Sequence, residues 1–148
     1  MIVPDVNVLV FAYRREADRH ERYARWLNQV VAGSDELGLV DMVLAGFLRI
    51  VTNPRILASP APMVDAMAFV DGVRAAQRGR RVSATDSTWS VLSSLAAEDS
   101  EVRGNLVPDA WLAALARSHG ATVATADRGF GRFPGLRFFD PGRVDRPS

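Results

Sequence analysis

Three aspartates in this chain have the chemistry and the placement to hold a cation. Asp5 ends the apolar run IVPD, Asp109 lies in the first turn of PDAWLAALA, and Asp127 follows the apolar stretch ATVAT. A carboxylate in apolar surroundings is costly unless it has a partner, a cation or access to water. Converging carboxylates also repel one another, and an all-oxygen set suits a hard ion such as Mg²⁺, with Mn²⁺ as a substitute. We therefore predict that these aspartates are catalytic and bind metal.

Polar residues beside the acids suggest what such a metal site would do. A bound ion polarises a phosphoryl oxygen, activates water and stabilises the leaving oxygen, so phosphoryl chemistry is the natural expectation. Asn7 and Thr125 could orient a ligand or a water, or could simply cap strand and helix ends. Arg128, next to Asp127, is a candidate contact for a substrate phosphate, its alternative being an ordinary turn residue.

Each acid also has an ordinary structural interpretation. Asp109 would be favoured in a first helical turn by the helix dipole, and Asp127 before Arg128-Gly129 resembles a turn residue. Asp5 is harder to explain in this way, because apolar residues surround it. The three positions taken together favour a shared site.

The elements that must position these acids are those of an α/β domain. Short apolar runs alternate with helical segments, which predicts a central parallel sheet with helices on both faces. The expected strands are 2–5, 37–40, 80–84, 121–126 and 136–140. A short helix is expected to begin near residue 7, and further helices are expected over 18–32, 42–52, 63–78, 87–98 and 108–118. Gly79 is the predicted C-terminal cap of the helix over 63–78, and Asp86 the predicted N-cap of the helix over 87–98. Ligands bind beyond the carboxyl ends of such strands, where Asp5 and Asp127 belong and which Asp109 reaches if its helix begins there.

Length and composition limit the function classes. The 148 residues predict one domain over 1–148, with a core of about 1–140 and a short C-terminal tail. The absence of cysteine excludes disulfides, zinc thiolates and a cysteine nucleophile. All 18 basic residues are arginine, which excludes a phosphate-loop NTPase and Schiff-base catalysis. No run approaches a membrane span and no secretory signal begins the chain, so we expect a cytoplasmic protein without membrane contact.

Three segments of the chain resemble one family. VPDVNVLVFAY, GFLRIVTNPRI and PDAWLAALARSHGATVATADRGFGRF are similar to PIN-domain ribonucleases, above all to the VapC-type toxins of bacterial toxin–antitoxin pairs. The resemblance implies an α/β/α fold, magnesium-dependent cleavage of structured or single-stranded RNA (transfer RNA being a candidate), a homodimer, and a cognate VapB-type antitoxin. It also assigns the family's acids to Asp5, Asp109 and Asp127, and its small polar residue to Thr125.

One position departs from the family pattern. The family usually has a further acid in the helix after the second strand, and this chain has Gly46 there. Asp41 lies five residues earlier and could substitute for the missing acid if it ends the strand near the same edge. The missing acid leaves open how many metal ions the site binds and how active the protein is.

Two other functions remain open from the sequence. The first is a phosphatase or phosphotransfer domain with Asp5 as nucleophile, although Asn7 stands where such families usually have a second acid, and no lysine is present. The second is a catalytically degenerate PIN-like module that binds RNA or protein without cleavage, because it lacks the acid at Gly46.

Overall fold

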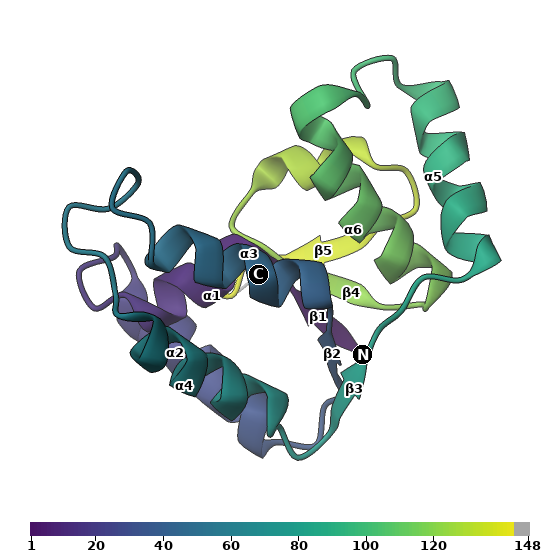
Figure 1. Cartoon of the computed structure of the whole chain (residues 1–148). Helices are drawn as coiled ribbons and strands as arrows, with labels where there is room; N and C mark the ends of the chain where they lie inside the picture. Colours follow the sequence, from purple (N-terminus) through teal and green to yellow (C-terminus); the bar gives the residue numbers. More distant parts are fainter. Residues whose placement is uncertain (144–148) are drawn as a thin grey trace.

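A five-stranded parallel sheet forms the centre of the protein in a computed structural model that describes residues 1–143 (Figure 1). Its strands run in the order β3-β2-β1-β4-β5, and each neighbouring pair is parallel. The strands are β1 (Ile2–Pro4), β2 (Leu37–Leu39), β3 (Gly79–Arg81), β4 (Thr122–Ala124) and β5 (Arg137–Phe139). The prediction of an α/β domain with a parallel sheet is confirmed; residues 144–148 of the predicted tail lie outside the described residues.

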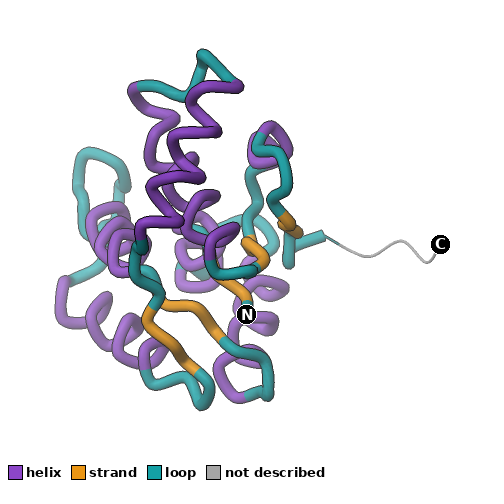
Figure 2. Tube along the Cα trace, turned by 90° about the vertical axis from the view of Figure 1, so that its right-hand side faces the viewer, coloured by secondary structure: helices purple, strands orange, loops and turns teal. Residues whose placement is uncertain are grey.

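Helices cover both faces of this sheet. Figure 1 shows the strands between a group formed by α1–α4 and the pair α5–α6, and Figure 2 shows the short strands surrounded by helices. The helices are α1 (Val6–Tyr13), α2 (His20–Ala32), α3 (Asp41–Val51), α4 (Met63–Arg74), α5 (Asp86–Glu98) and α6 (Val107–Ser118), with 3₁₀ turns η1 (Gly104–Leu106) and η2 (Arg128–Arg132). None of the helices in residues 1–143 has the length and apolarity needed to cross a membrane.

The strand order creates a crevice between β1 and β4. The chain proceeds outward from β1 to β2 and β3. It then returns through the helices α5 and α6, which place β4 on the other side of β1. Val3 pairs with Val123 and Pro4 with Ala124, and the Asp5 N–H donates to the Ala124 carbonyl at 2.8 Å. This reversal of direction is where open α/β sheets bind ligands, and the segments carrying Asp5 and Asp127 leave the sheet there.

Two helix boundaries differ from the sequence prediction. The helix expected over 63–78 ends at Arg74, and Gly79 begins β3 instead of capping the helix. A side chain at residue 79 would lie 3.3 Å from both the Ala76 carbonyl oxygen and Leu39, so glycine permits the tight entry into the strand. β3 therefore begins one residue earlier than predicted, and it ends at Arg81 rather than at residue 84.

The N-cap of α5 is Thr85, not Asp86 as predicted from the sequence. Thr85 and Thr88 form a capping box, in which the Thr85 N–H donates to the Thr88 hydroxyl at 3.1 Å. The same hydroxyl lies 2.8 Å from that of Ser118, at the end of α6. A reciprocal cap that also joins two helices satisfies more backbone donors than the Asp86 side chain could from inside the first turn.

Tyr23 fastens the end of the described chain to α2. Its hydroxyl donates to the Asp140 carboxylate at 2.8 Å, and the Gly142 N–H donates to the same oxygen at 2.8 Å. Gly142 lies directly on the Tyr23 ring, because a Cβ there would come within 2.2 Å of the ring carbon that carries the hydroxyl. The contact holds β5 and the segment after it against the helical layer.

Tyr23→Phe should lower the free energy of unfolding by about 1–2 kcal/mol, because the Asp140 carboxylate loses a donor in a partly buried place. Tyr13→Phe is the matched control, since the Tyr13 hydroxyl makes no hydrogen bond within residues 1–143. Urea unfolding followed by circular dichroism measures both variants. Equal losses in the two would show that the Tyr23–Asp140 bond contributes nothing specific.

Candidate active site

The Asp5 carboxylate is buried at the crevice and has several hydrogen-bond donors. Asp5 is only 8% exposed and caps α1, where its Oδ1 accepts the Val6 N–H at 2.7 Å. Its Oδ2 accepts the Thr125 hydroxyl at 2.8 Å and the Asn7 side-chain amide at 3.2 Å. These donors offset the cost of burying the carboxylate at the end of an apolar strand.

Asn7 and Thr125 connect the ends of β1 and β4. The Asn7 amide group also donates to the Thr125 hydroxyl oxygen at 3.2 Å, and the Asn7 carbonyl oxygen accepts the Ala126 N–H at 3.1 Å. The Thr125 oxygen accepts the Asp127 N–H at 3.0 Å. The structure therefore brings both predicted polar residues into one network with Asp5, and that network also fixes the backbone of Asp127.

Asp127 and Asp109 approach the crevice from two further elements. Asp127 caps η2 by accepting the Gly129 N–H at 2.7 Å, and its side chain is exposed. Asp109 lies in the first turn of α6, one residue after Pro108. The sequence placed Asp109 at this edge only if its helix begins there. The structure meets that condition, because Asp109 and Asp127 line one cavity together with Asp5. Arg128 is exposed at the start of η2 and is not among the residues that line the cavity.

This cavity has a volume of about 640 Å³ and an uneven chemistry. The three aspartates and Asn7 form one part of its wall, which we call the acid end, because Asn7 bonds Asp5 and the charges of the three acids act on one another. The remaining wall comes mainly from apolar side chains of α1 and α3 and from the start of α6. The volume lies within the range of small-molecule sites, so the acids face a space that a nucleotide-sized group can enter.

The acids perturb one another. Burial raises the pKa of Asp5, and the charge of Asp127 raises it further, whereas the bonds from Thr125 and Val6 lower it. Burial raises the pKa of Asp109 from 3.8 to about 6, helped by the charges of Asp5 and Asp127. Two negatively charged neighbours and partial burial thus disfavour the ionised form of Asp109, which a cation in the cavity would reverse.

The donor set fits a hydrated ion better than a closed protein cage. Over residues 1–143, no three His, Cys, Asp or Glu side chains lie close enough to hold one ion together. Mg²⁺ usually keeps several waters and binds through one or two carboxylates. Oxygen ligands of mutually repelling carboxylates at one cavity end meet that requirement, and the third acid can act through bound water.

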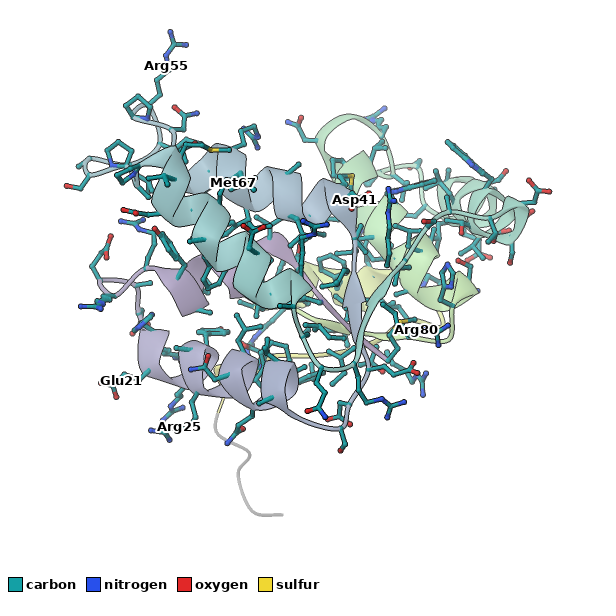
Figure 3. All side chains as sticks on the ribbon, turned by 60° about the horizontal axis from the view of Figure 1, so that its bottom comes forward. Glu21, Arg25, Asp41, Arg55, Met67 and Arg80 are labelled. Carbon is teal, nitrogen blue, oxygen red and sulfur yellow. The ribbon has the colours of Figure 1, made fainter. Side chains whose placement is uncertain are left out.

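Gly46 and Asp41 differ in their relation to the cavity. Gly46 lines it, and a Cβ at this position would lie 3.2 Å from the Val6 side chain. Asp41 is exposed at the start of α3 (Figure 3), pairs with Arg81, and lines a separate cavity. The structure therefore gives no support to the idea that Asp41 substitutes for the family acid missing at Gly46.

One cavity residue was missed by the sequence reasoning. Arg49, on α3, lines the same space as the acids. It follows Gly46 by three residues, so the two share a helix face. That spacing was visible in the sequence and could have identified Arg49 once Gly46 was placed at the site.

Comparisons with known proteins agree on one family. Residues 2–136 match the PIN domain. The VapC ribonuclease Mb2897 of Mycobacterium bovis is 41% identical over 141 residues, which cover 95% of each chain. Ribonuclease VapC25 of Mycobacterium tuberculosis is 36% identical over 141 residues, covering 95% of this chain and 99% of its own.

Solved structures share the fold at lower identity. The structure of VapBC2 from Rickettsia felis, bound to a promoter DNA fragment, matches with a TM-score of 0.70 and 19% identity, covering 95% of this chain and 98% of the other. FitAcB from Neisseria gonorrhoeae matches with a TM-score of 0.70 and 20% identity, covering 97% and 100%. At these identities the likeness concerns the fold.

Asp109→Asn should stabilise the metal-free protein at pH 7.5 by about 1 kcal/mol, a value discounted for solvent screening. The folded protein holds this carboxyl with a pKa of about 6 instead of 3.8. Its ionisation therefore costs stability as the pH rises from about 4 to 6, and the full cost is present above that range. Asparagine has no ionised form and avoids the cost.

Urea unfolding in chelator at pH 4.0 and pH 7.5 tests this expectation. The advantage of the variant over the natural protein should be larger at pH 7.5. An equal advantage at both pH values, or a loss at pH 7.5, would contradict the assignment of Asp109 to an electrostatically strained site.

Proposed function

Because the chain belongs to the PIN-domain family and to its VapC ribonucleases, we propose that it cleaves RNA with a divalent ion held at the Asp5 end of its cavity. The observation that carries the proposal is the placement of Asp5, Asp109 and Asp127 around one cavity at the β1–β4 crevice. Mg²⁺ is the proposed ion, and Mn²⁺ its substitute. The reaction is endonucleolytic hydrolysis that leaves a 5′-phosphate and a 3′-hydroxyl.

Asp5 and Asp109 are the carboxylates that would hold the ion, with Asp127 acting through bound water. When bound, the ion supplies polarisation of the phosphoryl oxygen and activation of the attacking water. Thr125 and Asn7 position the Asp5 carboxylate, and the Thr125 hydroxyl keeps its Oδ2 oriented and favours its ionised form. The Gly129 N–H holds Asp127 in the same way.

The family also supports a set of partners. VapBC complexes occur among the solved structures of the same fold. We propose that this chain is the toxin of such a pair, that a cognate VapB-type antitoxin neutralises it, and that it acts as a homodimer in the cytoplasm. Transfer RNA is the proposed substrate, and Arg128, exposed beside Asp127, is a proposed phosphate contact.

Purified protein, free of antitoxin, should cut labelled total RNA into discrete fragments in Mg²⁺, and chelator should abolish the cleavage. Asp5→Asn and Asp109→Asn should each lower the rate at least about 100-fold, because each removes a carboxylate from the ion site. Asp41→Asn is the matched control, since Asp41 pairs with Arg81 outside the cavity. Sequencing of the fragment ends identifies the target.

The same experiment separates the alternatives. Cleavage by Asp5→Asn at the natural rate would refute the site. Folded protein that binds RNA but cuts none in Mg²⁺ or Mn²⁺ would be the degenerate module, with Gly46 as the reason. Rapid hydrolysis of a phosphomonoester without effect on RNA would favour the phosphatase.

Thr125→Val should lower cleavage about 10–100-fold, since it keeps the shape of the side chain but removes the hydroxyl that orients Asp5. Thr125→Ser should restore most of the rate, because it returns the hydroxyl. Calorimetric titration with Mn²⁺ should show weaker binding for the valine variant alone. If serine and valine behave alike, the residue serves packing and not the orientation of Asp5.

A further inference from the structure

The α3 wall of the cavity carries a single charged residue. The residues of α3 that line the cavity share one face of the helix and are Met42, Val43, Ala45, Gly46, Arg49 and Ile50. Arg49 is the charged member of this set, and it lies one turn beyond Gly46. The opposite charges of the cavity therefore come from different elements, the carboxylates from β1, α6 and η2 and the guanidinium from α3.

The Arg49 side chain is available to a ligand. It is exposed, and no carboxylate pairs with it in the part of the chain that the structure describes. By contrast, several surface arginines are paired, as Arg81 is with Asp41 and Arg132 with Asp99. Asp5, the most buried acid of the cavity, is satisfied by its own donors and not by Arg49.

This arrangement of charges fits a chain of phosphates. A phosphate beside the aspartates would be neutralised by the proposed ion, whereas the next phosphate along the same strand would still lack a positive partner. Arginine binds phosphate oxygens through its planar fork of donors. The rest of the cavity lining is mostly apolar, with Val6, Val10 and Ile50 among its residues. Such walls suit the apolar faces of an unpaired nucleoside.

We infer that Arg49 binds the phosphate next to the scissile one in a single RNA strand, with the intervening nucleoside against Val6 and Val10. This inference rests on the proposed function, and it names a substrate-binding residue on α3. Arg49 contacts the substrate and takes no part in holding the ion.

Gly46 makes this role possible. A side chain at residue 46 would approach Val6 within 3.2 Å at its Cβ and would narrow the groove between α1 and α3. An acid at this position would also stand three residues from Arg49, a spacing at which opposite charges pair on a helix. The glycine therefore leaves both the space and the arginine free for the RNA.

Binding of a fluorescent single-stranded RNA to the Asp109→Asn protein in Mg²⁺, in which cleavage is slowed, tests the inference. Adding Arg49→Gln should weaken binding about tenfold, and should reduce the slope of log affinity against log salt by about 0.7, the value for one phosphate contact on a single strand. Arg25→Gln is the matched control, because Arg25 projects outward from α2 (Figure 3) and is not among the residues that line the cavity. It should change affinity less than about twofold.

A second variant, Gly46→Glu, should reproduce the loss of affinity and of slope, because the new carboxylate would pair with Arg49. Circular dichroism confirms folding for each variant. An Arg49→Gln protein with the same slope as the Arg25→Gln control would overturn the inference, as would weaker binding without a change in slope. Absence of RNA binding by the parent protein would overturn it as well.

Failure of the inference and of the proposed function remain distinguishable. The natural protein is assayed separately for cleavage. If it cuts RNA in Mg²⁺ while Arg49→Gln keeps the full slope, the ribonuclease assignment stands and Arg49 is not a phosphate contact. If it binds RNA without cutting and the slope falls for Arg49→Gln, the contact stands and the catalytic proposal fails.

Discussion

The buried carboxylate of Asp5 is the constraint on which the site depends. An ionised group at the end of an apolar strand is tolerated only when donors surround it, and here those donors are the Val6 N–H, the Asn7 amide and the Thr125 hydroxyl. Thr125 lies 120 residues away in sequence. The parallel pairing of β1 with β4 brings the two residues together. The hydrogen bonds of the site therefore form only when the sheet has this strand order.

The acids around Asp5 do not stabilise the fold, so their presence needs a functional explanation. Burial and the charges of Asp5 and Asp127 raise the pKa of Asp109 to about 6, which means that folding holds this carboxylate in an unfavourable place. Surface ion pairs such as Arg81–Asp41 carry no such cost and contribute little. A cation in the cavity would remove this cost, and that is the physical support for the ion site proposed above.

The sequence predicted the acid end of the site because strand ends are local features. Asp5 and Asp127 follow apolar runs, and the rule for parallel sheets places such residues at one edge. Other features depended on packing that no local pattern records. Gly79 enters β3 tightly beside Ala76 and Leu39 instead of ending α4, and the Thr88 hydroxyl that reciprocates the Thr85 cap also contacts Ser118 of another helix. Arg49 was missed because the sequence does not show that the face of α3 with Gly46 and Arg49 lines the same cavity as α1.

The α3 wall gives the departure at Gly46 a physical meaning. The resemblance in sequence predicts a carboxylate on this face, whereas the face that lines the cavity has no acid and carries Arg49 one turn further on. The change moves the local charge from negative to positive while leaving Asp5, Asp109 and Asp127 in place. With fewer carboxylates on its wall, the cavity would hold the proposed ion less tightly by itself and would depend more on the substrate phosphate to bind it. In the proposed complex Arg49 would compensate on the substrate side, because holding the neighbouring phosphate would keep the scissile one near the aspartates.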